Sequence, residues 1–394
     1  MRGLLAGCII SIVALLAGCC SLIYEGQEQI LPASNPDYRF EVVKGYNIAV
    51  ENGNVHISEL TDGKVYIKML HGWNLTLDIW NPNVLKSFNG EVYAGGVEVV
   101  KIKNSSVEWI KELFEKTAGY EGTRENLTPV YGESNLNVFD IESDGEYLYI
   151  TTRYEIVKTD ADLNVVRAVR LLNNDIAVSD GIYATRENQV IKLDKSCELG
   201  WAVALKSDEK IKHEIPEEKR KEAEKEGEIV SEFVEVEKYY IDLYAIYADD
   251  YVYVAGFIRE HFSGPPYEID YPFLVKLSTG GELIWAERVN VTYPEHESNH
   301  GEGKIIKDGE RYIAWAGNCL LVFDEDGRVL DFYLLEGEIT DVGLNSNTIY
   351  LASPWDASVK VERKEASPVP IEIKAVKHQP EVEYIECHSK YVSG

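Results

Sequence analysis

The sequence has few of the residues and motifs that mark nucleic-acid-binding, zinc-binding or common catalytic proteins. Basic residues number 39 against 67 acidic ones, which gives a net charge of −28 and argues against nucleic acid as a partner. No CxxC pair is present, so a zinc ribbon is not expected. The chain also has no GxSxG, no P-loop and no GxGxxG after a strand. Methionine occurs only 2 times and Lys and Glu are abundant, a composition typical of hyperthermophiles that suggests an archaeal source.

The apolar content is high enough for a folded core and too low for a protein with many membrane spans. Hydrophobic residues make up 45% of the 394 residues and aromatic residues 11%. The aromatic residues are mostly Tyr (25) and Trp (7) rather than Phe (10), which favours strands over helices. These values predict an all-β protein.

The N-terminus, residues 1–18, has the pattern of a signal peptide. Its apolar run from Leu4 to Leu16 is too short for a full membrane span. The run ends in Leu16-Ala17-Gly18-Cys19, which resembles the lipobox of bacterial and archaeal lipoproteins. That resemblance implies cleavage before Cys19, a lipid on its thiol, and a location on the outer face of the cytoplasmic membrane. Residues 19–37 then form a lipidated tether; an uncleaved anchor helix is the alternative.

An exported protein meets the glycosylation machinery, so N-x-S/T triplets become candidate glycan sites. The chain has four such triplets, at Asn74, Asn104, Asn126 and Asn290.

A unit of four antiparallel strands repeats along residues 38–378, and residues 379–394 follow it as a tail. Each of the clearest copies consists of two hairpins. The first commonly has an Asp-Gly turn, such as Asp144-Gly145, and the second begins in a motif like Val157-Lys158-Thr159-Asp160. The second motif recurs as Ile191–Asp194, Val275–Ser278 and Leu321–Asp324. Weaker copies on both sides, of which Ile339–Val376 is the last, bring the number to about seven. A four-stranded sheet repeated radially predicts a β-propeller, with six or eight blades as the alternatives.

The copy from Leu277 to Trp285 resembles the end of a pyrroloquinoline-quinone-type propeller repeat, in which a Thr-Gly turn precedes a Trp. Members of that superfamily include quinone dehydrogenases and non-enzymatic lipoprotein scaffolds, so the resemblance implies a fold and not an activity. The equivalent Trp201 and Trp285 are expected to be largely buried between blades. To close the ring, we favour Tyr38–Val43 as the outer strand of the last blade, with Val382–Cys387 as the alternative.

Strand alternation places the long connections on one face of the ring, where binding loops are expected. One of them, the charged insertion 207–238, contains a solvated helix that Pro216 begins and Gly227 ends. The long connections are 115–136, 207–238, 259–270, 290–303 and 352–358.

Three histidines of this face, His261, His296 and His300, stand among carboxylates and form the one candidate metal site in the sequence. Pro294 and Gly301 interrupt any helix that would align the last two histidines. Surface loop histidines are the simpler interpretation, so no cofactor is predicted and a divalent metal stays a hypothesis.

These features favour a non-enzymatic function. We expect a lipid-anchored extracellular β-propeller that acts as a binding or scaffold protein, with a protein or glycan partner on the loop-rich face. The alternative is an extracellular quinone- or metal-dependent enzyme that acts on small molecules or glycans.

Overall fold

The computed structural model describes residues 29–31, 38–77, 82–111, 120–123, 126–129, 138–152, 154–207, 212–214, 217–225, 227, 233–262, 268–291, 303–354, 359–380 and 382–385. The predicted signal peptide and Cys19 lie outside these ranges. Regular structure within them is almost entirely strand, and no helix there is long and apolar enough to cross a membrane.

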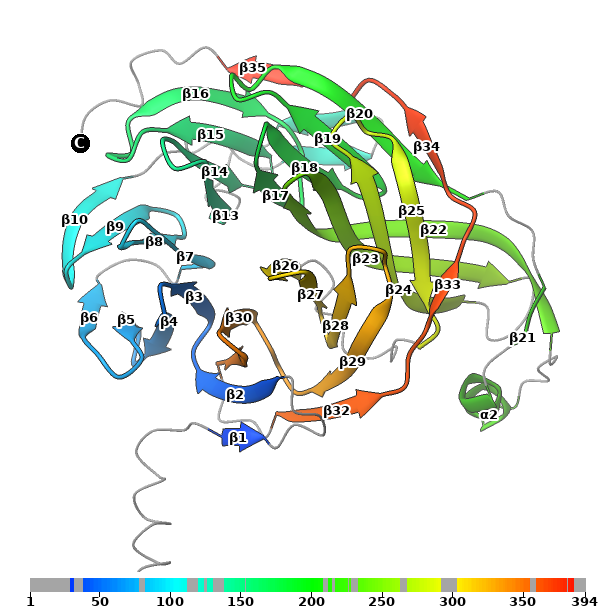
Figure 1. The fold of residues 1–394 in the computed structure, drawn as a ribbon. Helices are drawn as coiled ribbons and strands as arrows, with labels where there is room; N and C mark the ends of the chain where they lie inside the picture. Colours follow the sequence, from blue (N-terminus) through cyan, green and yellow to red (C-terminus); the bar gives the residue numbers. More distant parts are fainter. Residues whose placement is uncertain are drawn as a thin grey trace, which may run out of the picture.

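Seven sheets of four or more strands, which we call blades 1 to 7, form a ring (Figure 1). The innermost strand of each blade contacts the innermost strands of both neighbours, and contact between β30 and β3 closes the ring. The seven-bladed β-propeller predicted from the repeats is therefore confirmed. Blades are packed on both faces, which explains why middle strands such as β14 are buried at every residue instead of alternating.

In blades 1 to 4, the four strands follow one another in chain order from the axis outward. Blade 1 is β3 (Asn47–Glu51), β4 (Asn54–Thr61), β5 (Lys64–Met69) and β6 (Asn74–Leu77); blade 2 is β7 (Val84–Phe88), β8 (Glu91–Gly95), β9 (Val99–Lys103) and β10 (Ser106–Lys111). Blade 3 is β13 (Val138–Ser143), β14 (Leu148–Thr152), β15 (Glu155–Thr159) and β16 (Val165–Arg170); blade 4 is β17 (Asp175–Val178), β18 (Ile182–Arg186), β19 (Gln189–Leu193) and β20 (Leu199–Lys206).

Blades 5 and 6 have the same order, and blade 7 combines strands from both ends of the ring sequence. Blade 5 is β22 (Phe233–Ala248), β23 (Tyr251–Phe262), β24 (Glu268–Ser278) and β25 (Leu283–Val289); blade 6 is β26 (Gly303–Asp308), β27 (Arg311–Ala316), β28 (Cys319–Asp324) and β29 (Val329–Glu336). Blade 7 is β30 (Asp341–Asn345), β31 (Thr348–Ser353), β2 (Arg39–Lys44) and β1 (Gln29–Leu31). A separate hairpin pairs β11 (Tyr120–Thr123) with β12 (Asn126–Pro129), and β21 (Lys212–Glu214) pairs with β22.

The ring is closed from the N-terminal side, but not with the strand order that we expected. Strand β2 is the third strand of blade 7 and runs parallel to β31, with Phe40 opposite Ile349. The prediction that this segment is the outermost strand is wrong, because β1 takes that place. Tyr38 and Phe40 are about 1% exposed in the core between blades 6 and 7, so this apolar segment is buried further inside the blade than an outer strand would be.

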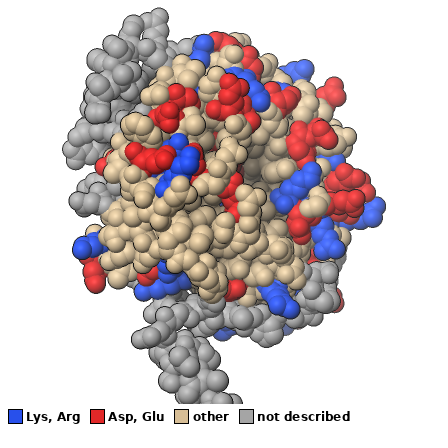
Figure 2. All heavy atoms as spheres, turned by 60° about the vertical axis from the view of Figure 1, so that its left-hand side comes forward, with Lys and Arg blue, Asp and Glu red and all other residues tan. Residues whose placement is uncertain are grey.

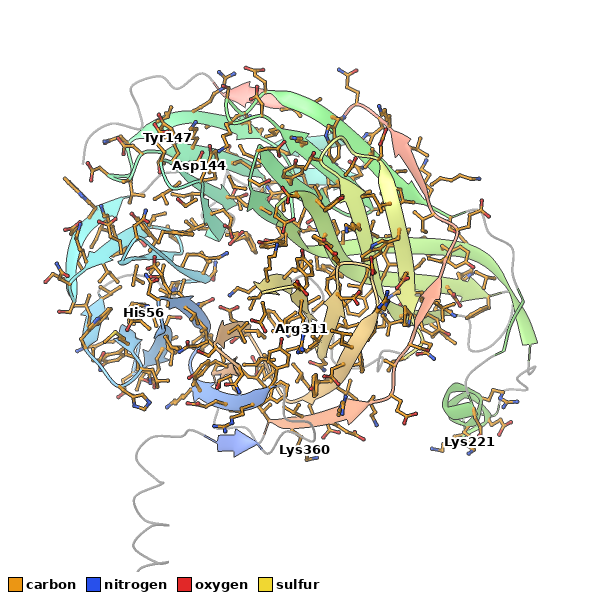
Figure 3. The ribbon with its side chains drawn as sticks, in the orientation of Figure 1. His56, Asp144, Tyr147, Lys221, Arg311 and Lys360 are labelled. Atoms are coloured by element: carbon orange, nitrogen blue, oxygen red, sulfur yellow. The ribbon has the colours of Figure 1, made fainter. Side chains whose placement is uncertain are left out.

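The C-terminal segment runs around the rim of the ring and adds a fifth strand to four consecutive blades. Val359–Val361, expected in the last blade, belongs instead to a strand that pairs with β29 of blade 6. Each of the four strands runs antiparallel to the fourth strand of its blade, which covers that hydrogen-bonding edge. Lys360 marks the start of this belt in Figure 3. The belt consists of β32 (Lys360–Lys364) on blade 6, β33 (Pro368–Pro370) on blade 5, β34 (Lys374–Lys377) on blade 4 and β35 (Glu383–Ile385) on blade 3.

The turn between the third and fourth strands is built around one side chain. In blade 4, Asp194 Oδ1 accepts hydrogen bonds from the backbone N–H groups of Ser196 (2.8 Å) and Glu198 (2.9 Å). The turn leaves these two N–H groups without a backbone acceptor, so a short side chain that accepts from both fixes the conformation of the turn. The same arrangement recurs at Asp160 and Asp324, and a serine hydroxyl takes the place of the carboxylate at Ser278.

Each of these turns receives side chains from the preceding blade. The carbonyl oxygen of Glu325 in blade 6 accepts hydrogen bonds from Lys276 Nζ (2.9 Å) and from Trp285 Nε1 (3.2 Å), both in blade 5. Lysine and tryptophan act together because they are opposite each other in the register of β24 and β25. In the same way, Lys192 and Trp201 of blade 4 both donate to the Thr279 carbonyl. Lys101 donates to the Ala161 carbonyl and Lys158 to the Lys195 carbonyl.

Trp201 and Trp285 lie between blades, as expected, and are partly buried, because they pack on the outer turn of the next blade and not in its centre. Close contact with that turn requires a residue without a side chain: a Cβ on Gly281 would lie 2.9 Å from Trp201 Cδ2. Gly281 also has a φ of 83°, which glycine adopts without strain.

The charged insertion contains the predicted helix. Helix α2 (Glu217–Lys225) begins directly after Pro216 and is followed by Gly227 with a φ of 87°. Lys221 Nζ lies 2.5 Å from Glu217 Oε1 one turn away. Figure 3 shows Lys221 outside the ring, as expected of a solvated helix.

Charges of both signs are interspersed on the face that Figure 2 presents. The ion pairs of blades 1 and 2 include Lys68 with Glu59 (2.8 Å) and Lys103 with Glu91 (2.7 Å). The excess of carboxylates over the whole chain therefore does not form a single acidic patch on this face.

We expect Lys276→Met to destabilise the ring by about 1–2 kcal/mol, because it removes a charged donor from the Glu325 carbonyl and a cation 3.9 Å from the centre of the Tyr251 ring. Denaturant unfolding measures the difference. The control is Lys360→Met, whose ion pair with Glu336 is exposed and is expected to contribute nothing measurable. Equal effects of the two substitutions would contradict the role given to the inter-blade contact.

Candidate functional site

The inner strands of the blades surround a central channel with two cavities. The larger, of about 310 Å³, is lined by residues of β7, β13, β17, β22 and β26, and the smaller, of about 240 Å³, reaches β3 and β30. Two lysines, Lys86 and Lys304, line both cavities. Both cavities lie in the described part of the chain, and the side chains around the two lysines form the candidate site.

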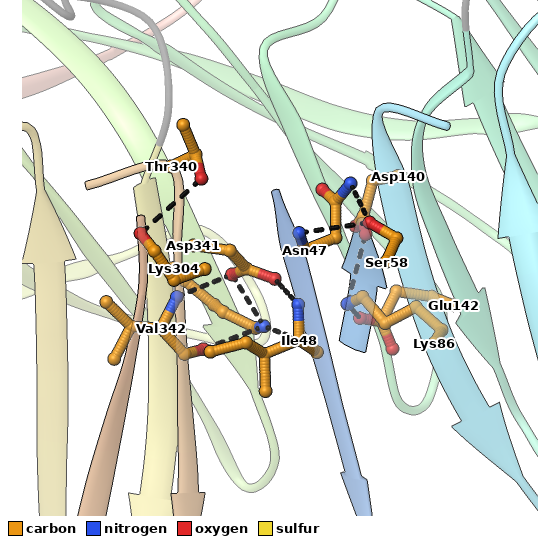
Figure 4. A network of polar contacts seen from close by, with 11 residues as sticks. Asn47, Ile48, Ser58, Lys86, Asp140, Glu142, Lys304, Thr340, Asp341 and Val342 are labelled. Atoms are coloured by element: carbon orange, nitrogen blue, oxygen red, sulfur yellow. Dashed lines mark hydrogen bonds and ion pairs between the residues drawn. The ribbon is translucent and has the colours of Figure 1, made fainter. Parts of the chain in front are cut away.

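Lys86, on blade 2, reaches two carboxylates of blade 3 (Figure 4). Its Nζ lies 3.0 Å from Asp140 Oδ1 and 2.5 Å from Glu142 Oε1. Asp140 is 6% exposed, and its second oxygen, Oδ2, has no hydrogen-bond partner. Burial alone would lower the pKa of Lys86, but Asp140 and Glu142 raise it well above its ordinary value. Lys86 is therefore a permanent cation between two blades.

Lys304 connects three blades on the other side of the channel (Figure 4). Its Nζ lies 3.0 Å from Asp341 Oδ1 and 2.9 Å from the Val342 carbonyl oxygen in blade 7. The second oxygen of Asp341 accepts the N–H of Ile48 in blade 1 at 2.7 Å. Both oxygens of Asp341 are therefore used, and this ion pair is part of the closure between blades 6, 7 and 1.

Asp175 is the third carboxylate near Lys86. Its Oδ2 accepts the N–H of Ile246 at 2.9 Å, which joins blade 4 to blade 5, and the residue lines the larger cavity. Burial, followed by the negative charge of Asp140, raises the pKa of Asp175 well above its ordinary value. Burial also raises the pKa of Glu142, with Lys86 acting in the opposite direction. The positive charge of Lys86 thus acts on three carboxylates.

Blade 5 extends beyond the ring on the face that we predicted to be rich in loops. This blade 5 extension comprises Phe233–Leu243 of β22, Gly256–Phe262 of β23 and Glu268–Pro272 of β24. The prediction of a long loop over 259–270 is wrong in its extent, because the two strands remain paired as far as His261 and Glu268. The extension leaves the ring at a bulge in β22, where a Cβ on Gly256 would lie 2.0 Å from the Asp242 carbonyl oxygen.

Ion pairs and hydrogen bonds make the extension rigid. Arg259 binds Asp270 through two bonds of 2.7 and 2.8 Å, a bidentate arrangement that fixes both side chains. The buried Glu260 binds Arg288 of β25 at 2.6 Å, and the Arg288 guanidinium lies 4.2 Å from the centre of the Tyr271 ring. The face of the sheet that carries Arg259 and Asp270 also carries Lys238 and Tyr240, both exposed to solvent.

The structure gives only part of the predicted metal site. His261 lies on β23, partly exposed, with Nδ1 3.4 Å from Glu268 Oε1. His296 and His300 lie outside the described residues, so the metal hypothesis stays a prediction. Within the described ranges, no group of three or more His, Cys, Asp or Glu residues is arranged to hold a metal ion.

The candidate glycosylation sites are on strands and turns of the rim. Asn74 begins β6 and Asn104 lies in the turn after β9, both exposed, and Asn126 begins β12. Asn290 is exposed too, but its Oδ1 accepts the N–H of Ser367 in the belt at 2.7 Å. Glycosylation of these residues stays a prediction.

Two cysteines, Cys197 and Cys319, are buried and have free thiols. Burial raises the pKa of both thiols, that of Cys197 to about 11, so neither is a reactive thiolate at neutral pH.

Sequence reasoning missed the channel site, although a signal was present. Asp140, Asp175 and Asp341 each stand near the start of an inner strand and are followed by Ile or Val. Among numerous acidic residues that recurrence had no evident meaning. Only the ring shows that inner strands from different blades bring these side chains to one axis.

Comparisons with known proteins concern the fold alone. No protein-family model matches the chain, and no curated protein matches it in sequence. Among solved structures, it is similar to BamB from Moraxella catarrhalis (11% identity, 80% of this chain and 92% of that chain, TM-score 0.41). It is also similar to the Pan2 WD40 domain of Neurospora crassa (11%, 81% and 88%, TM-score 0.45) and to BBS1N in complex with ARL6DN (11%, 87% and 96%, TM-score 0.45). At these TM-scores the assignment rests on the blades themselves.

We expect Asp175→Asn to stabilise the protein at neutral pH. The raised pKa means that folded Asp175 binds its proton more tightly than the unfolded chain does. Wild-type stability therefore falls as the pH rises from the ordinary carboxyl value of about 4 through the raised one. Asparagine removes the charge and keeps an oxygen for the Ile246 N–H.

Urea unfolding between pH 4 and 7 measures this effect. The variant should have a higher midpoint than wild type at pH 7 and a weaker dependence on pH. Asp326→Asn, in an exposed turn, is the control and should follow wild type. A lower midpoint of Asp175→Asn at every pH would contradict the prediction.

Proposed function

We propose that this β-propeller is a binding or scaffold protein held at the outer face of the cytoplasmic membrane by a lipid on Cys19. The support for the anchor is the lipobox-like sequence that ends at Cys19. A charge of −28 would be repelled by anionic headgroups, so an anchor by lipid and not by electrostatics fits the composition.

The partner, a protein or a glycan, binds the blade 5 extension in this proposal. The observation that carries it is that one face of the ring bears a rigid projection of paired strands on which Lys238 and Tyr240 are exposed. A surface that is already ordered loses little conformational entropy on binding. Tyr240, which is 43% exposed with the Lys238 ammonium 4.1 Å from its ring centre, is the kind of aromatic contact that contributes most to interfaces.

The anchor is tested by Cys19→Ser. We expect the variant to appear in the medium or to remain unprocessed, because serine offers no thiol for lipid attachment. Cys20→Ser is the control and should stay in the membrane fraction. Normal retention of processed Cys19→Ser protein, measured by fractionation and intact mass, would contradict lipid attachment at Cys19.

The partner surface is tested by Tyr240→Ala with Tyr251→Ala as the matched control. Both tyrosines are partly exposed (43% and 38%), and each has a lysine ammonium close to its ring. Tyr251 begins β23 at the opposite end of the blade, so its substitution leaves the extension unchanged. We expect Tyr240→Ala to lose most of the partner recovered by crosslinking and purification from native membranes, as quantified by mass spectrometry. Equal recovery with both variants would contradict binding at the extension.

A further inference from the structure

The belt follows the rim of the ring blade by blade, and blade 2 is the next blade on its path. Its four strands lie on blades 6, 5, 4 and 3, in that order. The fourth strand of blade 2, β10, is paired with β9 alone among the described strands. An outermost strand of this kind offers a row of N–H and C=O groups to any strand that can pair with it.

Strand β10 exposes apolar side chains, unlike the outermost strand of blade 1. Val107, Trp109 and Ile110 have exposed fractions of 38%, 45% and 52%. Strand β6 of blade 1, which also has no belt strand among those described, exposes the polar Asn74 and Thr76 instead. An exposed apolar edge favours pairing with a further strand, so blade 2 and not blade 1 has the surface that suits one.

The most exposed of the three residues, Ile110, stands where the belt reaches the other blades. In the register of the third and fourth strands, its equivalents in blades 3 to 6 are Ala168, Ala202, Ala286 and Phe332. All four are buried. The belt backbone reaches each of them, through strand pairing in blades 3 and 6 and through hydrogen bonds of 3.1 and 3.4 Å to the carbonyl oxygen in blades 4 and 5.

The spacing of the belt indicates which residues come next. A new strand begins every six to nine residues and is three to five residues long, with starts at Lys360, Pro368, Lys374 and Glu383. At this interval the next strand begins between residues 389 and 392. Tyr391 and Val392 have high strand propensity, and any three-residue strand that begins in this interval contains at least one of them.

We propose that residues 389–393 of the C-terminal tail form a further belt strand, antiparallel to β10, which covers the edge of blade 2. These residues lie outside the described ranges. The pairing brings Tyr391 or Val392 to the edge that carries Ile110 and removes apolar surface from water. The tail competes well against a second copy or another protein, because it is joined to the rim of the neighbouring blade at Ile385 and has a high effective concentration there.

Hydrogen exchange of the full-length protein, followed by mass spectrometry of peptides that cover β10, tests this pairing. The variant replaces both Tyr391 and Val392 by proline. Proline has no N–H, and neighbouring residues of a strand turn to opposite sides, so one of the two prolines lacks the donor that would face β10. We expect the amides of β10 to exchange roughly tenfold faster than in wild type, and those of β6 to be unchanged.

The matched control places two prolines at Cys387 and His388, before the proposed strand. The connection between β34 and β35 already contains Pro380, so a connection of the belt tolerates proline. In this control β10 should exchange at the wild-type rate. Equal exchange of β10 in all three proteins would overturn the proposal. Exchange that slows with protein concentration in all three would overturn it too, and would indicate a second copy on β10.

A photocrosslinker tests the same contact with the tail unaltered, so that the result does not depend on the folding of the proline variant. We place p-benzoylphenylalanine at Ile110, which is exposed enough to accept it. Irradiation should give crosslinks within one chain to residues 389–393, located by mass spectrometry. Crosslinks only to other segments, or only between two copies, would overturn the assignment of the tail to blade 2.

Discussion

The contact of blades 2 to 5 with the outer turn of the blade that follows is the interaction on which most of the ring depends. One carbonyl, of Thr279 or Glu325, accepts both a lysine ammonium and an indole N–H, so the turn and the angle between blades are fixed together. Blade 6 lacks this pair of donors, because Val322 and Asp331 stand in the places of the lysine and the tryptophan. Blade 7 takes its third strand from β2, so the hairpin turn that these side chains would contact is replaced by a parallel pair.

The belt compensates for this change and stabilises the outside of the ring. Asp331, at the position where blades 2, 4 and 5 have tryptophan, is 7% exposed and pairs with Arg363 of β32. A fifth strand on blades 3 to 6 covers edges that are otherwise open to pairing with other chains. Pro368 and Pro370 are tolerated in β33 because an outermost strand needs only one hydrogen-bonding edge.

The sequence predicted the repeated unit well because local rules decide it. Asp-Gly turns, the Asp or Ser that fixes the second hairpin, and apolar runs act within a few residues, so seven blades and α2 followed from them. Strand partners far apart in the chain followed only in part. Strand β2 joins the last blade, as expected, but as its third strand and parallel to β31. The segment from Lys360 pairs with blade 6 and was not expected there, because neither local propensity nor turn chemistry distinguishes this partner from others. The lysine of the repeat was visible, but its acceptor is a carbonyl of another blade.

The channel follows from the same geometry as the blades. Seven inner strands leave an axis too wide to fill with their own apolar side chains, so polar groups meet there and bind across blades. Lys304 and Asp341 form a set whose hydrogen bonds join blades 6, 7 and 1. Around Lys86 the arrangement differs, because three carboxylates lie near one lysine and Asp140 Oδ2 is buried without a hydrogen-bond partner. The two lysines of the axis therefore join blades in different ways: Lys304 within a set in which both oxygens of its carboxylate are used, and Lys86 among carboxylates that are not all paired.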